Sequence, residues 1–379
     1  FDIASDPNDV KVGYTIDYAA RGLQANQLAL GGYFNGIQSA GSSPKFATLM
    51  TTAFSAPDVP SLQGFYTGLT PAGALAPSAS ALVNNLDFSN ALLGCNNGSS
   101  LASAGCTWGT FGETHGSQMA SFGGIGFAQS MSGVSAGYEH AMSGRTLMGG
   151  ALRYDTGSLS ADGNQSLSGN AYTLGLVAKQ LVGTNDAISA NVIGGAANYA
   201  SLRTPGLAGA TAATGNETTT YVGAHVRAER EVHTGTMTMR PFVDLGMTRV
   251  NASALNETGA DVLDAKVAAH GETFTTAQSG ISLEGLWHSA AMTLQPSLDF
   301  SVTQLLGNAQ SSTLATLAGA PSGVAPFVLA NTFDRTRFSL VPSIRIFEKN
   351  NIDLRLSGGY QFSDSWHSFG ADAQISKHL

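Results

Sequence analysis

The chain has 379 residues, of which 12% are charged and 46 are glycine. This charged share is about half that of ordinary soluble domains, and the net charge of −8 excludes a basic surface for nucleic acid, so no nucleic-acid partner is expected. No stretch approaches 18 apolar residues, which excludes membrane-spanning helices but not membrane-spanning strands.

The first 73 residues are predicted to be a linker or junction region with short helices. Phe1 is neither an initiator methionine nor part of a signal peptide, so we expect the chain to be the C-terminal part of a longer protein. Residues 1–17 are expected to be extended, and apolar residues at helical spacing predict a helix within 18–40. A short helix is expected at 45–54, followed by Pro and Gly punctuation from 57 to 77. A small helical domain is the alternative to a docked linker.

Residues 74–94 are predicted to form a helix that plugs a pore. The segment PSASALVNNLDFSNALLG begins at Pro77 with serines that can cap a helix, and it ends at Gly94. Ser and Asn residues are scattered among small Ala residues, so the helix lacks a wide apolar stripe for burial in a core. About sixteen helical residues span roughly 24 Å, close to the apolar height of an outer-membrane barrel. Such a helix suits the wet interior of a barrel.

Cys95 and Cys106 are the only two cysteines, and they enclose a short segment rich in Gly and Ser. An even pair that closes a short loop indicates a disulfide formed in an oxidising compartment such as a periplasm. Two unpaired thiols are the alternative. We expect residues 95–106 to be a periplasmic loop between the helix and the first strand.

Residues 107–379 are predicted to form a barrel of twelve antiparallel transmembrane strands. Apolar and polar residues alternate along them, as Ile352, Leu354 and Leu356 do with their neighbours. The expected strands are 106–116, 131–142, 145–155, 168–181, 186–199, 218–232, 236–250, 272–287, 291–304, 332–347, 351–362 and 365–377.

Two features indicate that the apolar face meets lipid and is not the core of a soluble sandwich. The strands have about ten residues or more, whereas strands of soluble proteins average about five or six. Tight turns also alternate with long polar loops, a pattern typical of a membrane barrel. The expected long loops are 117–130, 156–167, 200–217, 251–271 and 305–331. The predicted fold class is therefore an all-β, twelve-stranded outer-membrane barrel with an α-helix threaded through its lumen.

The opposite face of the strands carries charges that are predicted to line the lumen. Mixed charges at similar depth would pair with one another and with the polar helix, because unpaired buried charges are costly. A hydrated pore wall is the alternative. Inward glycines such as Gly175 and Gly195 would leave room for the helix. The predicted lumen and helix-contacting residues are Glu139, Arg153, Lys179, Arg227, Glu229, Glu231, Arg240, Asp244, Glu284, Asp299, Arg345 and Arg355.

Three segments resemble a known family. CTWGTFGETHG (106–116) and SGVSAGYEHAMSGRTLMGGALRYDTGSL (132–159) resemble the opening strands of autotransporter (type V secretion) β-domains, and GLQANQLALGGYFN (22–35) is similar to the segment that precedes many of these barrels. The resemblance implies a translocator in a Gram-negative outer membrane that exports and anchors an N-terminal passenger. It implies a monomer whose partners are outer-membrane lipid, the barrel-assembly machinery, periplasmic chaperones and the passenger. The short turns and the C-terminus would be periplasmic, and the long loops and N-terminal region extracellular.

The C-terminus departs from the family pattern. Members usually end in Phe or Trp, which the assembly machinery is understood to read, whereas this chain ends ISKHL. Leu379 is an even number of residues from Phe369 and Ile375, so it is predicted to lie on the same lipid-facing side of the strand. We therefore expect this signal to be weakened and not lost.

No catalytic activity is predicted apart from self-cleavage. The sequence has no G-x-S-x-G, H-E-x-x-H or P-loop motif and no Cys/His cluster, so no enzyme, metal site or cofactor is expected. VNNL, which contains Asn84 and Asn85, resembles the paired asparagines at which some protease-type autotransporters cut their own pore helix. There a side-chain amide attacks its own backbone carbonyl, and the lumen carboxylates that would position the amide or a water are Glu139, Glu229 and Glu284. The alternative is that the two asparagines only make the helix polar.

Two other functions are open on the sequence alone. A general outer-membrane pore for small solutes would share the polar lumen, but it would start directly at its first strand. The third candidate is the membrane anchor of a surface adhesin or esterase, whose activity would reside in a module that this chain lacks.

Overall fold

A computed structural model describes residues 15–41, 44–93, 105–288, 293–347 and 351–379, together with the backbone of 2–6 and 9–13. Its helices lie mainly before the barrel. They are α1 (Ala25–Ser39), η1 (Pro44–Phe46), α2 (Ala47–Phe54), α3 (Val59–Leu69), η2 (Ala72–Leu75), α4 (Ala76–Ala91) and η3 (Asp261–Leu263). None of these helices is long and apolar enough to cross a membrane.

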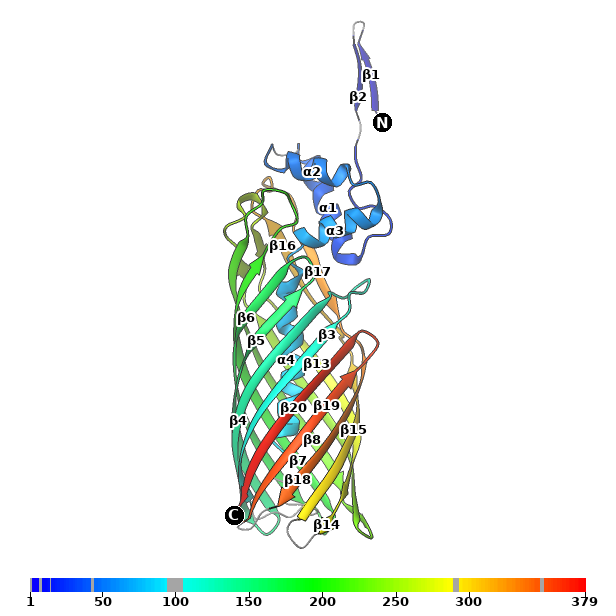
Figure 1. The fold of residues 1–379 in the computed structure, drawn as a ribbon. Coiled ribbons are helices and arrows are strands. Elements are labelled where there is room, and N and C mark those ends of the chain that lie inside the picture. Colours follow the sequence, from blue (N-terminus) through cyan, green and yellow to red (C-terminus); the bar gives the residue numbers. More distant parts are fainter. Residues whose placement is uncertain are drawn as a thin grey trace.

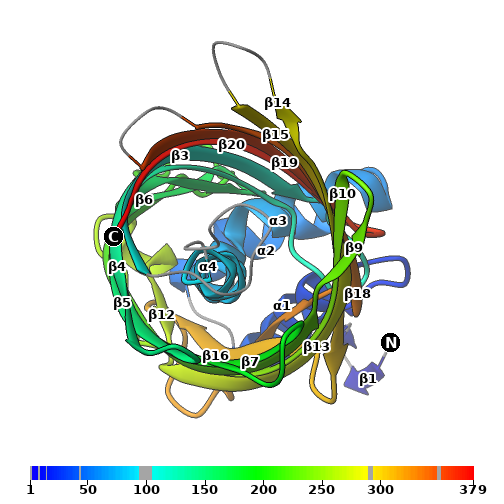
Figure 2. The ribbon, with the colours of Figure 1, turned by 90° about the horizontal axis from the view of Figure 1, so that it is seen from below.

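Twelve long strands form a closed antiparallel barrel in the described part of the chain (Figures 1 and 2). They are β3 (Gly105–Gln118), β4 (Phe127–Ser143), β5 (Thr146–Ala161), β6 (Gln165–Leu181), β7 (Asp186–Arg203), β8 (Ala213–Arg230), β10 (Met237–Ala252), β13 (His270–Gly285), β15 (Thr293–Leu306), β18 (Thr336–Phe347), β19 (Ile352–Phe362) and β20 (Trp366–His378). β20 pairs with β3, and β13 pairs with β15, so the sheet closes on itself. The predicted twelve strands and the helix inside them are confirmed.

The remaining strands are short and lie outside the barrel wall proper. Among the described residues β1 (Asp2–Asp6) and β2 (Asp9–Gly13) pair only with each other, while β9 (Val232–Thr234) pairs with β10 and β14 (Trp287–His288) pairs with β15. β11 (Leu255–Asn256), β12 (Ala265–Val267), β16 (Gln310–Leu317) and β17 (Phe327–Thr332) form a four-stranded sheet, called here the upper sheet. It is built from two of the predicted long loops, 251–271 and 305–331.

Large apolar side chains point outward from the middle of the strands. Leu152 and its cross-strand neighbour Leu174 are 63% and 51% exposed, and Val222 and Leu245 are exposed to a similar extent. A soluble protein would bury such a continuous apolar surface. The exposed belt is the surface that a membrane barrel presents to lipid.

Residues 15–75, called here the cap, lie over one end of the barrel (Figure 1). The ring of Phe34 lies between those of Tyr18 and Tyr66, with centroid distances of 6.1 and 5.6 Å. The cap rests on the upper sheet, where the ring of Tyr33 lies 5.0 Å from that of Phe327. These buried aromatic contacts fix the cap on the loops of the barrel.

A fully buried ion pair joins the cap to the barrel. Nε of Arg203 donates to the Glu257 carboxylate at 2.9 Å, and the same guanidinium donates to the carbonyl oxygens of Leu69 and Leu263 at 3.2 and 2.7 Å. Neither charged side chain is exposed. One arginine therefore connects the end of α3, the end of β7 and the loop that contains η3.

The prediction of a long loop at 156–167 is wrong. β5 and β6 continue through it and meet at a tight turn, where Gly163 and Asn164 adopt positive φ angles of 81° and 58°. Above the apolar belt the outward positions carry Ser158 and Ser168, while Leu159 and Leu167 face inward and are buried. The apolar side of the strands therefore reverses, and the pattern that marks a lipid-facing strand ends while the backbone pairing continues.

Helix α3 lies in the segment that was predicted to be Pro and Gly punctuation. The Asp58 carboxylate accepts a hydrogen bond from the Ser61 N–H at 2.8 Å and caps the helix. Pro60 occupies the first turn, where a backbone N–H has no helical acceptor to lose. The side chain and the backbone N–H of Ser61 together lower the pKa of Asp58.

Candidate functional site

The candidate site is the lumen, and α4 lies inside the ring of strands (Figure 2). The helix packs on β5, β7, β8 and β10. A Cβ atom at Gly175 would lie 2.4 Å from Leu92, and one at Gly223 would lie 2.4 Å from the amide of Asn85, so these two glycines let the helix approach. Gly195 instead makes room for the ring of Tyr221.

Asn85 is the central contact between helix and wall, and it is fully buried. Its Oδ1 accepts a hydrogen bond from the Thr248 hydroxyl at 2.9 Å and lies 3.0 Å from Nε2 of His225. The other ring nitrogen of His225 lies 3.1 Å from the Asp244 carboxylate. An amide turned by 180° would donate Nδ2–H to a neutral ring nitrogen, so both orientations of Asn85 keep it bound to the ring.

Three further polar contacts hold the lower turns of α4. Asn191 donates to the Ser89 hydroxyl at 2.9 Å, and a terminal nitrogen of Arg227 donates to Oδ1 of Asn90 at 2.6 Å. On the far side, Gln361 donates to the Asp87 carboxylate at 3.0 Å. Buried polar groups need such partners, so the polar composition of the helix matches the wall around it.

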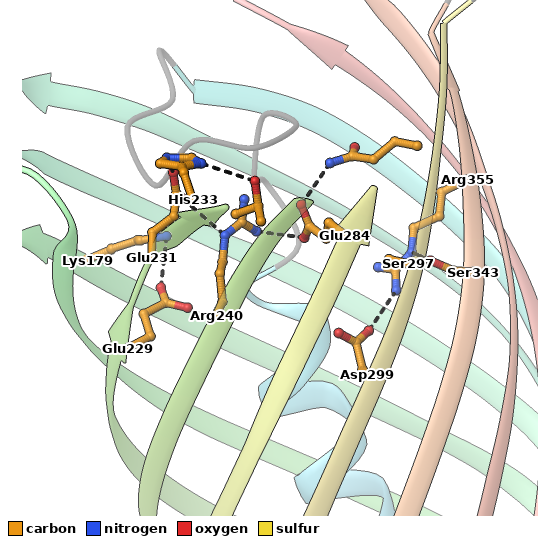
Figure 3. A network of polar contacts seen from close by, with 12 residues as sticks. Lys179, Glu229, Glu231, His233, Arg240, Glu284, Ser297, Asp299, Ser343 and Arg355 are labelled. Atoms are coloured by element: carbon orange, nitrogen blue, oxygen red, sulfur yellow. Dashed lines mark hydrogen bonds and ion pairs between the residues drawn. The ribbon is translucent and has the colours of Figure 1, made fainter. Parts of the chain in front are cut away.

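A network of ion pairs surrounds the lumen near the short-turn end (Figure 3). Arg240 lies between two carboxylates, 3.2 Å from Glu231 and 2.8 Å from Glu284. Lys179 pairs with Glu229 at 3.1 Å on the neighbouring wall. These pairs couple adjacent strands and neutralise charges that a narrow lumen would otherwise leave unpaired.

The other predicted lumen charges also face wall partners. Arg227 bridges wall and helix, because its Nε donates to Asp244 at 3.1 Å while its terminal nitrogen reaches Asn90. Arg153 pairs with Asp155 at 2.8 Å, Arg345 lies 3.7 Å from Asp353, and Arg355 lies 3.7 Å from Asp299. Glu139 is buried at a position in register with Cys106.

A cavity of about 390 Å³ lies beside the helix. Asp87 and Asn90 face it from α4, while Asp299, Arg355 and Gln361 face it from the strands opposite the anchored wall. Its lining carries both signs of charge, so it favours water and small ions over apolar molecules. The helix therefore does not fill the whole cross-section of the pore.

The contacts around the two asparagines come mainly from side chains other than the expected carboxylates. His225 and Thr248 hold Asn85, whereas Glu229 and Glu284 form ion pairs with Lys179 and Arg240. Asn84 is only partly buried. Self-cleavage at this pair stays a prediction.

The predicted disulfide falls partly outside the described residues. Cys106 is buried and belongs to a disulfide, and Cys95 lies in the part that is not described. In the described ranges no group of three or more His, Cys, Asp or Glu side chains could hold a metal ion.

The anchoring residues His225, Thr248, Asn191 and Gln361 were not predicted. All four occupy strand positions whose side chains point inward, so the alternation of side chains along each strand could have placed them in the lumen. The rotation of α4 about its axis decides which of them meet the helix, and a nearly uniform helix surface gives no signal for that rotation.

Comparison with known proteins gives a match at the level of the family. The autotransporter β-domain family model matches residues 107–359. The fold is similar to the translocator domain of the autotransporter NalP from Neisseria meningitidis, with 14% identity and a TM-score of 0.64, over 81% of this chain and 98% of that one. It is also similar to the β-domain of the Bordetella autotransporter BrkA, with 14% identity and a TM-score of 0.54, over 73% of this chain and all of that one. No curated protein sequence matches.

Proposed function

This chain belongs to the autotransporter β-domain family, its barrel is an outer-membrane translocator domain, and we propose that it exports an N-terminal passenger through the lumen and retains it at the cell surface. Domains of this family are transport units and not enzymes. The family also implies that a passenger precedes the barrel and that the belt of exposed apolar residues meets outer-membrane lipid.

The course of the chain carries this proposal. The cap lies at one end of the barrel, α4 occupies the lumen, and β3 begins at the other end (Figure 1). A segment that precedes the barrel in sequence thus passes through the barrel that follows it. A pore for general solutes gains nothing from a helix that is hydrogen-bonded to its wall, so this geometry favours export.

The proposed orientation has the short turns and the C-terminus in the periplasm and the cap and upper sheet outside. Short periplasmic turns and larger external loops are usual for outer-membrane barrels. The chain has tight turns between β4 and β5 and between β8 and β10, and the upper sheet lies at the opposite end. Ser322 and Thr234 are exposed positions at the two ends.

Cysteine labelling tests this orientation. Ser322→Cys should react with a membrane-impermeant maleimide on intact cells, and Thr234→Cys should react only after the outer membrane is permeabilised. The same cells should show a reporter fused before Phe1 as protease-accessible at the surface. Labelling of Thr234→Cys alone on intact cells would contradict the proposal.

Assembly of the barrel is proposed to use the barrel-assembly machinery and periplasmic chaperones, and the product is proposed to be a monomer. Support comes from β20, which pairs with β3 to close the barrel and carries the exposed apolar residues Phe369 and Ile375.

The helix is proposed to remain uncut after export and to be tied to β3 by a Cys95–Cys106 bond. Support for an intact helix comes from Asn85, whose side chain is already held by His225 and Thr248. Mass spectrometry of unreduced protein from membranes tests both points. Cleavage after Asn84 or Asn85, or two free thiols, would contradict them.

A further inference from the structure

The cavity beside α4 ends before it reaches the cap side of the barrel. Its lining extends from Arg345 and Gln374, near the short turns, to Ser301 on β15 and Ser368 on β20. Within the described residues, neither the cap nor the upper sheet contributes a residue to this lining. The polar part of the lumen therefore stops below the loops that carry the cap.

Five apolar side chains lie between the cavity and the cap, and they are called here the apolar seal. Trp366 is the next inward residue after Ser368 toward the cap along β20. The others come from β4, β13, β15 and the segment after β17. All five are buried in one apolar cluster, and none of them lines the cavity. The members are Phe127, Phe274, Leu305, Phe333 and Trp366.

Two aromatic contacts form the centre of the seal. The ring of Phe127 lies 5.7 Å from that of Trp366, and the ring of Phe274 meets that of Phe333 edge-on at 5.4 Å. The carboxylate of Asp334, which follows Phe333, accepts a hydrogen bond at 2.6 Å from the N–H of the residue before Trp366. This bond keeps the two ring pairs next to each other, although they come from different parts of the wall.

The cavity and the seal differ in how they receive an ion. The cavity is lined by charged groups such as Asp299 and Arg355, which can replace part of the water around an ion. Within the seal an ion would lose water without gaining a partner, which is costly. Narrow apolar constrictions of channels stop conduction in this way, because water leaves them. Arg337, 5.3 Å over the ring of Trp366, adds an electrostatic barrier to cations.

We infer that the apolar seal is a second gate of the lumen, which stops ions and small polar solutes between the cavity and the cap side while α4 is docked. The helix does not fill the lumen, so closure needs a second element. Leu75, directly before α4, belongs to the same buried cluster, so release of the helix should also loosen the seal. The seal can open without that release, because the hydrogen bonds of α4 to His225 and Thr248 involve none of its members. The inference rests on the proposed function only in taking the cap side as the cell exterior.

Conductance of the full chain in planar bilayers, with potassium chloride as the probe, tests the inference. The F274S/F333S variant should raise the steady conductance about five-fold or more, because serine hydroxyls let water enter the constriction. The large openings that report release of α4 should stay as rare as in the unchanged chain. F333S alone should give a smaller rise in steady conductance, and because Phe333 lies outside the strands of the barrel, this variant keeps the test valid where the double variant fails to fold.

F34S is the matched control. Phe34 is as fully buried as Phe274 and also meets a ring edge-on, that of Tyr18 at 6.1 Å, but it lies in the cap. It removes a similar apolar volume and should leave the steady conductance within about two-fold of the unchanged chain. Heat-modifiable migration on gels identifies the folded variants.

Two results would overturn the inference. One is a steady conductance that F333S and a folded F274S/F333S leave unchanged, which would place the barrier elsewhere. The other is an equal rise with F34S, which would assign the barrier to the cap as a whole. Reversed maleimide labelling would overturn the proposed orientation and leave the gate itself in place.

Discussion

The side-chain amide of Asn26 pairs with the backbone of Ala330 as a neighbouring strand would. Its Nδ2 donates to the Ala330 carbonyl at 2.9 Å, and its Oδ1 accepts from the Ala330 N–H at 2.8 Å. Ala330 lies in β17, whose partner strand in the upper sheet is β16 alone. A residue of α1 thus satisfies the free edge of this sheet and attaches the cap to it.

Asn26→Ala should loosen the cap without unfolding the barrel. The change leaves one N–H and one C=O of Ala330 without protein partners, which costs about 1–2 kcal/mol because the site is only partly buried. Hydrogen exchange at residues 327–332 should accelerate, and cleavage of the cap by trypsin at Arg21 or Lys45 should become faster. Asn308→Ala, at an exposed position with only local hydrogen bonds, is the control, and equal effects of both changes would contradict this role.

His225→Ala should release α4 from the wall. Asn85 and Asp244 each lose a buried partner, and a loss of about 1.4 kcal/mol raises the population of the released state ten-fold. In planar bilayers, large-conductance openings should therefore become about ten-fold more frequent than in the unchanged chain.

His140→Ala is the matched control for that measurement, because His140 is exposed on the outer face of β4. It should leave the openings unchanged. Frequent large openings in the unchanged chain that His225→Ala does not alter would show that the helix does not limit conductance.

Gly223→Ala should displace α4 by a steric clash, whereas His225→Ala removes a hydrogen bond. A methyl group there would lie 2.4 Å from the Asn85 amide, and overpacking of this kind costs about 1–3 kcal/mol. The temperature at which the folded gel band disappears should fall, and openings should increase. Gly194→Ala, where an added methyl group meets nothing closer than 4.0 Å, should change neither quantity.

The Asp334 carboxylate should stabilise the loop ends of β18 and β20 in a pH-dependent way. Burial raises its pKa, but hydrogen bonds from Ser363 and Ser365 outweigh burial and lower it overall. A group whose pKa is lowered in the folded state contributes stability above its unfolded pKa of about 3.9, and that stability is lost as the pH falls through the folded value.

Asp334→Asn should therefore destabilise these turns at pH 7, by no more than about 1 kcal/mol because the site is well solvated. The difference from the unchanged chain should begin to shrink near about pH 4, where the carboxyl of the unfolded chain becomes protonated, and should be lost as the pH falls through the lower folded pKa. Proteolysis rates at residues 333–335 and 363–365 measure it. A difference that grows on acidification would contradict the sign.

The sequence predicted the barrel better than the parts outside the membrane. Within the lipid-facing belt, contrasts such as Leu174 against Thr173 and Gly175 reveal each strand by alternation. Above the belt, Ser158 and Ser168 face outward while Leu159 and Leu167 face inward and are buried, so the apolar residues change sides and the lipid-facing pattern ends.

Side-chain partners across the lumen were less predictable than the strands. The polar helix and the charged wall indicated that they meet, but the contact of Asn85 with His225 depends on how far α4 shifts toward β8. That shift follows from two glycines, Gly175 and Gly223, whose effect becomes visible only in three dimensions.

The buried Arg203 imposes an order of events. Two of its partners, Glu257 and Leu263, belong to loops of the barrel, and the third, Leu69, belongs to the segment that the barrel itself is proposed to export. On the proposed route the third bond would form only after that segment has emerged, and the guanidinium would lose its contact with water at that step. Drawing the segment back would then require wetting the buried arginine and glutamate again.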